Sequence, residues 1–144
     1  MKFTILIALF TLSAALQAQE FEADIGVFFD LYKKGEIEQA VDTLYKSNPY
    51  VSSVSDQIKN VKTQLGSLTG LMGELHSIEK IDTFMVGKSM VHITYIGIYD
   101  RQPVRFEFQF FKLESDWRIF SFAFDADVFD DIETLAQPQA LSRE

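Results

Sequence analysis

The spacing of the apolar residues changes once along this chain, at about Leu75, from a repeat of 3.6 residues to a repeat of 2. The first repeat puts apolar side chains on one face of a helix, and the second puts them on one face of a strand. Helices are therefore expected before this point and strands after it. This order predicts an α+β fold, in which three N-terminal helices pack on a curved four-stranded antiparallel meander and a short C-terminal helix follows.

Three segments have the helical repeat before the change of spacing. The first runs from about residue 20 to residue 34, where lysines and a glycine favour a helix end. The second ends at Pro49, and the third begins with a capping pattern over residues 53–56. We expect the third helix to continue until Gly70 and Gly73 break it. The three apolar faces consist of Phe21, Ile25, Phe28, Phe29 and Tyr32, then Ile37, Ala40, Val41, Leu44 and Tyr45, then Val54, Ile58, Val61, Leu65 and Leu68.

Four strand-like segments follow, separated by three short connections, which is typical of an antiparallel meander. They cover residues 75–86, 90–99, 104–113 and 117–124. The first has apolar residues at both alternating positions, so a bulge or bend is expected there. A short helix is expected to start at Asp127. Its apolar face would contain Val128, Phe129, Ile132 and Leu135.

The strands can be aligned by the offset that brings apolar residues opposite one another, because a slip of one residue turns every side chain to the other face. Tyr95 is then expected to face Phe106, and Phe108 to face Phe122. The inner face, covered by the helices, would contain Val91, Ile93, Tyr95, Phe106, Phe108, Phe110, Phe120, Phe122 and Phe124. The outer face would carry the polar residues His92, Thr94, Arg105, Glu107 and Gln109. It would also expose Ile96, Ile98, Trp117 and Ile119, unless something packs on them.

The first 18 residues have the pattern of an export signal. Lys2 is followed by an unbroken apolar stretch and then by small residues up to Ala18, which predicts a cleaved signal peptide over residues 1–18. Residues 19–136 are then expected to form a single domain, and residues 137–144 a flexible tail. No cysteine lies near the cleavage site to accept a lipid anchor. The mature protein is therefore expected to be periplasmic or secreted, with no membrane anchor.

The composition argues against several kinds of partner and chemistry. A formal charge of −8 and a pI near 4.7 argue against nucleic acid and against an anionic membrane surface, because both attract clusters of Lys and Arg. The absence of cysteine removes disulfides, thiolate zinc sites and cysteine nucleophiles. His76 and His92 do not by themselves establish the three ligands that zinc or iron needs, and the aspartates of residues 125–131 do not match a calcium loop. No metal and no cofactor are expected.

Two segments resemble a known superfamily. They are Tyr95-Ile96-Gly97-Ile98-Tyr99 on one strand and Asp116-Trp117-Arg118-Ile119 at the start of the last strand. With the order of the elements, they make the chain similar to the nuclear-transport-factor-two-like (cystatin-like) superfamily, in particular to small exported bacterial members of unknown function. The resemblance implies a cone-shaped sheet whose cavity is a ligand pocket, a catalytic pocket or neither. It also implies homodimers formed through the outer sheet face, where Ile96, Ile98, Trp117 and Ile119 would lie.

The aromatic inner face is the basis of the functional prediction. We predict an exported, non-enzymatic protein that binds an apolar small ligand between the helices and the sheet, with Tyr95 and Tyr45 orienting it. The pocket would be lined by Phe28, Tyr32, Tyr45, Ile93, Tyr95, Phe106, Phe108 and Phe122. A simpler interpretation is an aromatic core without a cavity, since each buried ring contributes roughly 2 to 3 kcal/mol. A third is a module that binds a protein partner through its acidic helices.

An isomerase or hydrolase is the alternative function. Such an enzyme needs a base within hydrogen-bond reach of its substrate, and the predicted inner face contains no carboxylate, with Tyr95 as its only polar member. The base would have to come from Asp30, His76 or Asp82, if a bulge in the first strand turns one of them inward. We therefore expect no catalytic residues on the inner face.

Overall fold

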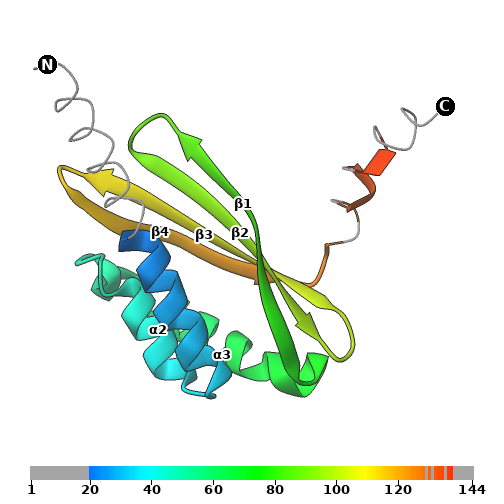
Figure 1. The fold of residues 1–144 in the computed structure, drawn as a ribbon. Helices are drawn as coiled ribbons and strands as arrows, with labels where there is room; N and C mark the ends of the chain where they lie inside the picture. Colours follow the sequence, from blue (N-terminus) through cyan, green and yellow to red (C-terminus); the bar gives the residue numbers. More distant parts are fainter. Residues whose placement is uncertain (1–19, 129, 131, 135, 138–144) are drawn as a thin grey trace, which may run out of the picture. The chain divides into compact units, whose positions relative to one another are not determined.

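A computed structural model describes residues 20–128, 130, 132–134 and 136–137 of the chain (Figure 1). Helices come first and a four-stranded open sheet follows, so the predicted α+β fold is confirmed. A short C-terminal helix comes after the sheet, and its described residues are 130, 132–134 and 136–137. The predicted signal peptide and nearly all of the predicted tail lie outside the described residues.

The helical part consists of three α-helices and one short 3₁₀ helix. A first helix covers residues 20–33, α2 covers Ile37–Tyr45, η1 covers Val51–Val54 and α3 covers Ser55–Met72. Gly35 and Gly73 follow the first helix and α3, and their φ angles of 78° and 87° are those of a left-handed helix end, which glycine adopts most easily. Gly70 lies inside α3, so only the second of the two predicted glycines ends this helix.

The strands are β1 (Leu75–Val86), β2 (Met90–Tyr99), β3 (Pro103–Leu113) and β4 (Asp116–Asp125). Their order in the sheet is β1-β2-β3-β4, so β1 and β4 are the edge strands. The pairing of β1 with β2 shifts between Lys80 and Asp82, which leaves Ile81 without a partner residue. The irregularity predicted for this strand is therefore confirmed as a bulge.

Contacts divide the chain into two compact units, whose boundaries run through α3, β3 and β4. The first unit contains residues 20–66 and 110–119 of the described chain. There Phe21 of the first helix packs against the rings of Phe110 and Trp117, at centroid distances of 5.8 and 5.1 Å. The prediction that Trp117 and Ile119 face outward is therefore wrong, since they are only 8% and 0% exposed.

The error in β4 has a physical cause in its sequence. This strand has large apolar residues at both alternating positions, so either set can face a core. The structure buries Trp117, Ile119 and then Phe122, whereas Phe120 is 62% exposed. The buried side changes between Ile119 and Phe122, and the prediction of Phe120 on the inner face is wrong.

The second unit contains residues 67–109 and the described residues from 120 onward. Here β2 and β3 alternate as predicted, and Val91, Ile93, Val104, Phe106 and Phe108 are buried. The ring of Phe108 contacts Tyr95 and Phe122 at centroid distances of 5.9 and 5.0 Å. The aromatic stripe predicted for adjacent strands is thus present, with Phe106 and Phe124 6.2 Å apart.

Among the described residues, none of the helices combines the length and the apolar character that a membrane span requires.

Candidate functional site

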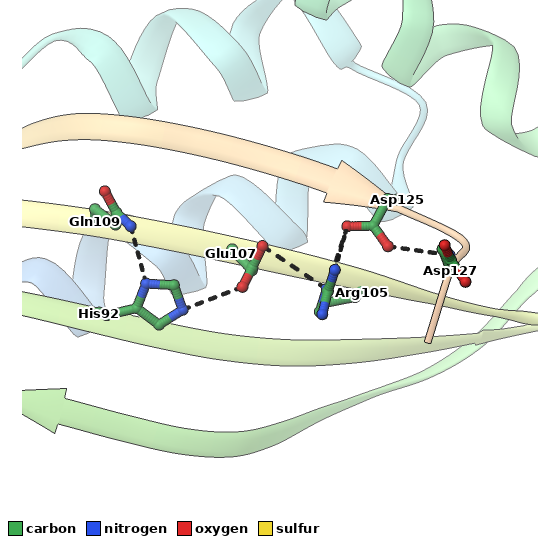
Figure 2. Close-up of polar contacts among 6 residues, drawn as sticks. All are labelled: His92, Arg105, Glu107, Gln109, Asp125 and Asp127. Atoms are coloured by element: carbon green, nitrogen blue, oxygen red, sulfur yellow. Dashed lines mark hydrogen bonds and ion pairs between the residues drawn. The ribbon is translucent and has the colours of Figure 1, made fainter. Parts of the chain in front are cut away.

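A row of hydrogen-bonded polar side chains crosses the outer face of the sheet in the second unit (Figure 2). Because every second residue of β3 is buried, the residues between them point to the opposite face. Together with partners from β2 and the end of β4, they form what we term the outer-face ladder: His92, Arg105, Glu107, Gln109 and Asp125.

Hydrogen bonds and ion pairs connect the residues of the ladder. The amide of Gln109 donates to Nδ1 of His92 at 3.1 Å, and Nε2 of His92 lies 3.2 Å from a carboxylate oxygen of Glu107. The guanidinium of Arg105 lies 3.7 Å from Glu107 and donates to Asp125 at 2.9 and 3.2 Å. Neighbouring strands therefore bring together residues that are up to 33 positions apart in the sequence, from His92 to Asp125.

The charges of the ladder nearly compensate one another. Hydrogen bonds to Asp125 raise the pKa of Arg105 above its usual value, and the nearby Glu107 adds to this effect. A second oxygen of Asp125 accepts the backbone N–H of Asp127 at 3.0 Å, which fixes this carboxylate at the end of β4. One guanidinium thus serves two carboxylates, and the ladder retains a small negative charge when His92 is neutral.

A cavity of about 540 Å³ lies beside this ladder, and we refer to it as the outer-face cavity. Its apolar walls come from β1, β2 and the C-terminal segment, and its charged residues come mainly from β3. It is lined by Ile81, Asp82, Thr94, Ile96, Arg105, Glu107, Val128, Ile132 and Thr134. Ile81 and Ile132 are 52% and 53% exposed, so the cavity is half open, and its volume lies in the range of small-molecule sites.

The first unit has a second cavity, of about 500 Å³, next to α2, η1 and α3. Lys62 of α3 lines it and makes ion pairs with Glu38 and Asp42 of α2, at 2.8 and 2.7 Å. These two carboxylates raise the pKa of Lys62, so the ammonium group stays charged and tied to α2. The pairs connect two helices, which makes a structural role for this cluster the more direct interpretation.

The residues predicted to line an inner pocket are divided between the two units. Phe28, Tyr32 and Tyr45 belong to the first unit, where the rings of Phe28 and Tyr32 stack at 6.1 Å. The others belong to the second unit: Ile93, Tyr95, Phe106, Phe108 and Phe122. The two cavities described above are lined by different residues. The inner pocket stays a prediction.

The residues predicted to form a dimer face do not form one exposed patch. Ile96 lines the outer-face cavity and Ile98 is exposed, whereas Trp117 and Ile119 belong to the buried part of the first unit. The cause is the change of buried side in β4. A dimer through these four residues would require Trp117 and Ile119 to leave the core.

The two histidines have separate partners. His76 pairs with Asp100 at 2.6 Å, while His92 pairs with Glu107 in the ladder. Within the part of the chain that the structure describes, no group of three or more His, Asp or Glu side chains could hold a metal ion.

The sequence pattern predicts the outer-face position of the ladder residues of β2 and β3, but it does not predict the contact of Asp125 or the C-terminal wall of the cavity. The available signal was the predicted outer face, which carries Ile96 together with the charged residues Arg105 and Glu107. Comparison of the chain with protein-family models, with curated proteins and with solved structures finds no match. The similarity to the nuclear-transport-factor-two-like superfamily therefore stays a prediction.

Proposed function

We propose that this chain is an exported, non-enzymatic protein that binds a small apolar ligand, and that the ligand occupies the outer-face cavity. The observation that carries the proposal is the composition of that half-open cavity: four aliphatic side chains line a volume of about 540 Å³ beside the outer-face ladder. Apolar walls supply affinity, and a few fixed polar groups supply orientation.

The polar groups of the cavity favour binding over catalysis. Arg105 and Glu107 are held by each other and by Asp125 and His92, so their charges already have partners. A catalytic base works best when its proton affinity is matched to the substrate and it can reach the reacting atom. Groups fixed in this way are better suited to orienting a polar atom of a ligand, together with the hydroxyl of Thr94.

The enzyme alternative depended on Tyr95 with a neighbouring carboxylate. Tyr95 follows Thr94 in β2, and successive side chains of a strand point to opposite faces. Since Thr94 lines the outer-face cavity with Glu107, Tyr95 is directed away from that carboxylate, and its ring contacts Phe108 at 5.9 Å. This arrangement supports a binding role over an isomerase or hydrolase.

The proposal of export is based on the sequence of residues 1–18, with its single lysine, apolar stretch and small residues. The formal charge of −8 favours a partner other than nucleic acid. A soluble exported binding protein is consistent with both features.

Titration with the apolar dye Nile red tests the site. We expect saturable binding to the full chain, and Ile96→Trp should weaken it by about tenfold or more, equal to about 1.4 kcal/mol, because the indole fills the cavity. Ile98→Trp is the matched control: it places the same side chain two positions away on the same face of β2, outside the lining residues.

Three outcomes would count against the proposal. Equal binding by the Ile96→Trp and Ile98→Trp variants would show that the ligand does not bind in the outer-face cavity. Loss of binding in Tyr95→Trp but not in Ile96→Trp would place the ligand on the inner face. Absence of saturable binding by the unmodified chain would leave no support for a ligand-binding function of this cavity.

A further inference from the structure

The edge strand β1 exposes apolar side chains along its second half. Phe84 is 61% exposed, and Met85 and Val86 are also exposed. Their partners in β2 are His92, Val91 and Met90, so the three side chains alternate between the two faces of the sheet. Long edge strands that expose apolar residues readily pair with another strand.

The bulge at Ile81 limits where another strand can pair. It places Lys80 opposite Tyr95 and Asp82 opposite Thr94, two adjacent residues of β2, so these two charged side chains point to opposite faces. A regular stretch of strand therefore runs from Asp82 to Val86. Beyond it, the turn that leads to β2 contains Lys88.

We infer that a second copy of this chain binds at this edge, with the two β1 strands antiparallel and Met85 opposite Met85 of the second copy. A two-fold axis through this pair puts Phe84 opposite Val86 and brings Asp82 next to the turn of the second copy that contains Lys88, and it repeats each contact in reverse. On one face of the combined sheet, two apolar pairs then lie between the two Asp82 carboxylates, and the long side chain of Lys88 extends from each turn toward the Asp82 of the other copy. Within the described residues, Asp82 and Lys88 have no ion pair inside one copy.

The charge pattern of β1 disfavours the neighbouring registers. An axis through Phe84 would set Asp82 opposite the apolar Val86, and an axis through Thr83 would set Asp82 opposite Phe84. An axis through Ile81 would set Lys80 opposite Asp82, but the bulge directs these two side chains to different faces. The Met85 register matches both the charges and the apolar residues, so the partner that fits this edge is another copy of the same strand.

A single introduced cysteine reports the register, because the chain has no cysteine of its own. Met85→Cys places two thiols on directly opposite residues, whose Cα atoms are about 4.5 to 5.5 Å apart, within reach of a disulfide. Thr83→Cys is the control on the same strand, since its two copies would be about 13 Å apart along the strands. With oxidised glutathione, we expect a covalent dimer from Met85→Cys and little from Thr83→Cys.

Charge reversal tests the proposed attraction between Asp82 and Lys88 of the second copy, without an introduced cysteine. Asp82→Lys and Lys88→Asp should each lower the fraction of dimer measured by sedimentation between about 1 and 100 µM protein, and the double variant should restore it. Asp30→Lys and Lys34→Asp make the same changes of charge in and just after the first helix, at exposed positions, and should leave the dimer unchanged.

The results that would overturn the inference are specific. The unmodified chain could stay monomeric over this range, which would leave the edge to a different strand or to solvent. The dimer could also persist in both single reversals, or Thr83→Cys could cross-link as well as Met85→Cys. Either result would place the interface elsewhere, and neither depends on whether the outer-face cavity binds a ligand.

Discussion

The two edge strands of the sheet differ in whether other parts of the chain bond to their outward-facing backbone groups. In β4, the backbone N–H of Ile119 donates to Oγ of Ser47 at 3.0 Å, and its carbonyl accepts from the side-chain amide of Asn48 at 2.9 Å. In β1, no side chain among the described residues bonds to the backbone of residues 82–86. The edge of β4 is bonded from within the chain at Ile119, whereas the second half of β1 is available for pairing.

The start of β1 is fixed although its second half is open. Asp100, in the turn between β2 and β3, accepts the backbone N–H of Glu74 at 2.7 Å and contacts His76 at 2.6 Å. The backbone N–H of Asp100 also donates to the carbonyl of Glu74 at 3.1 Å. The open edge is therefore a segment that begins after the bulge, rather than a whole strand that is loose.

The largest difference between the two edges should be in their contribution to folding stability. Trp117 of β4 is buried and packs on Phe21 in the first unit, whereas Phe84 of β1 is exposed. Trp117→Ala should lower the free energy of unfolding by about 3 to 5 kcal/mol. Phe84→Ala should change it by less than about 0.5 kcal/mol. Urea unfolding at a protein concentration low enough to prevent association measures both, and similar losses would contradict this comparison.

A smaller effect is expected where the chain closes the edge of β4. Asn48→Ala removes the hydrogen bond to the carbonyl of Ile119, which is partly buried, and should cost about 1 to 2 kcal/mol of unfolding free energy. Asn60→Ala is the matched control, because Asn60 is exposed on α3. If the two variants unfold at the same urea concentration, the Asn48 amide does not hold this edge.

The smallest effect concerns the contacts of Asp100 with Glu74 and His76 at the start of β1, and it depends on pH. The backbone N–H of Glu74, followed by His76, lowers the pKa of Asp100 below its usual value. A carboxyl group with a lowered pKa stabilises the fold above its usual pKa, near pH 4, and this contribution is lost as the pH falls through the lowered value. Asp100→Asn should therefore unfold earlier in urea than the unmodified chain at pH 6.

The difference between these two chains should shrink as the pH falls below about 4, when the carboxyl group of the unmodified chain also becomes neutral. Glu79→Gln, at an exposed position of β1, serves as the control for a general effect of removing a carboxylate. The difference in urea stability between Asp100→Asn and the unmodified chain could instead stay constant from pH 6 to about pH 2.5. That result would show that ionisation of Asp100 does not stabilise the start of β1.

The fold could be predicted where the sequence pattern is compatible with only one buried face of a strand or with a break in its alternation. In β3, Val104, Phe106, Phe108 and Phe110 occupy one set of alternating positions and polar residues fill most of the other, so the buried face is determined. In β1, apolar residues at both alternating positions predicted the bulge that the register shift at Ile81 shows.

The errors arose where local pattern leaves two choices or where contacts are distant in sequence. Trp117 and Phe120 are both large and apolar, and only the packing of Phe21 against Trp117 decides which one is buried. The pair of Arg105 with Asp125 depends on how β4 ends, and the outer-face cavity depends on Val128 beyond it. Strand periodicity gives no information about either contact.

Hydrogen–deuterium exchange measured at several protein concentrations tests the contrast between the two edges most directly. The amides of residues 82–86 that point away from β2 should become more protected as the concentration rises from about 1 to 100 µM, and the amide of Ile119 should be protected at every concentration. In Asp82→Lys the protection of β1 should no longer depend on concentration. Exchange of residues 82–86 that is equally fast at all concentrations, or a concentration-dependent change confined to β4, would contradict the account.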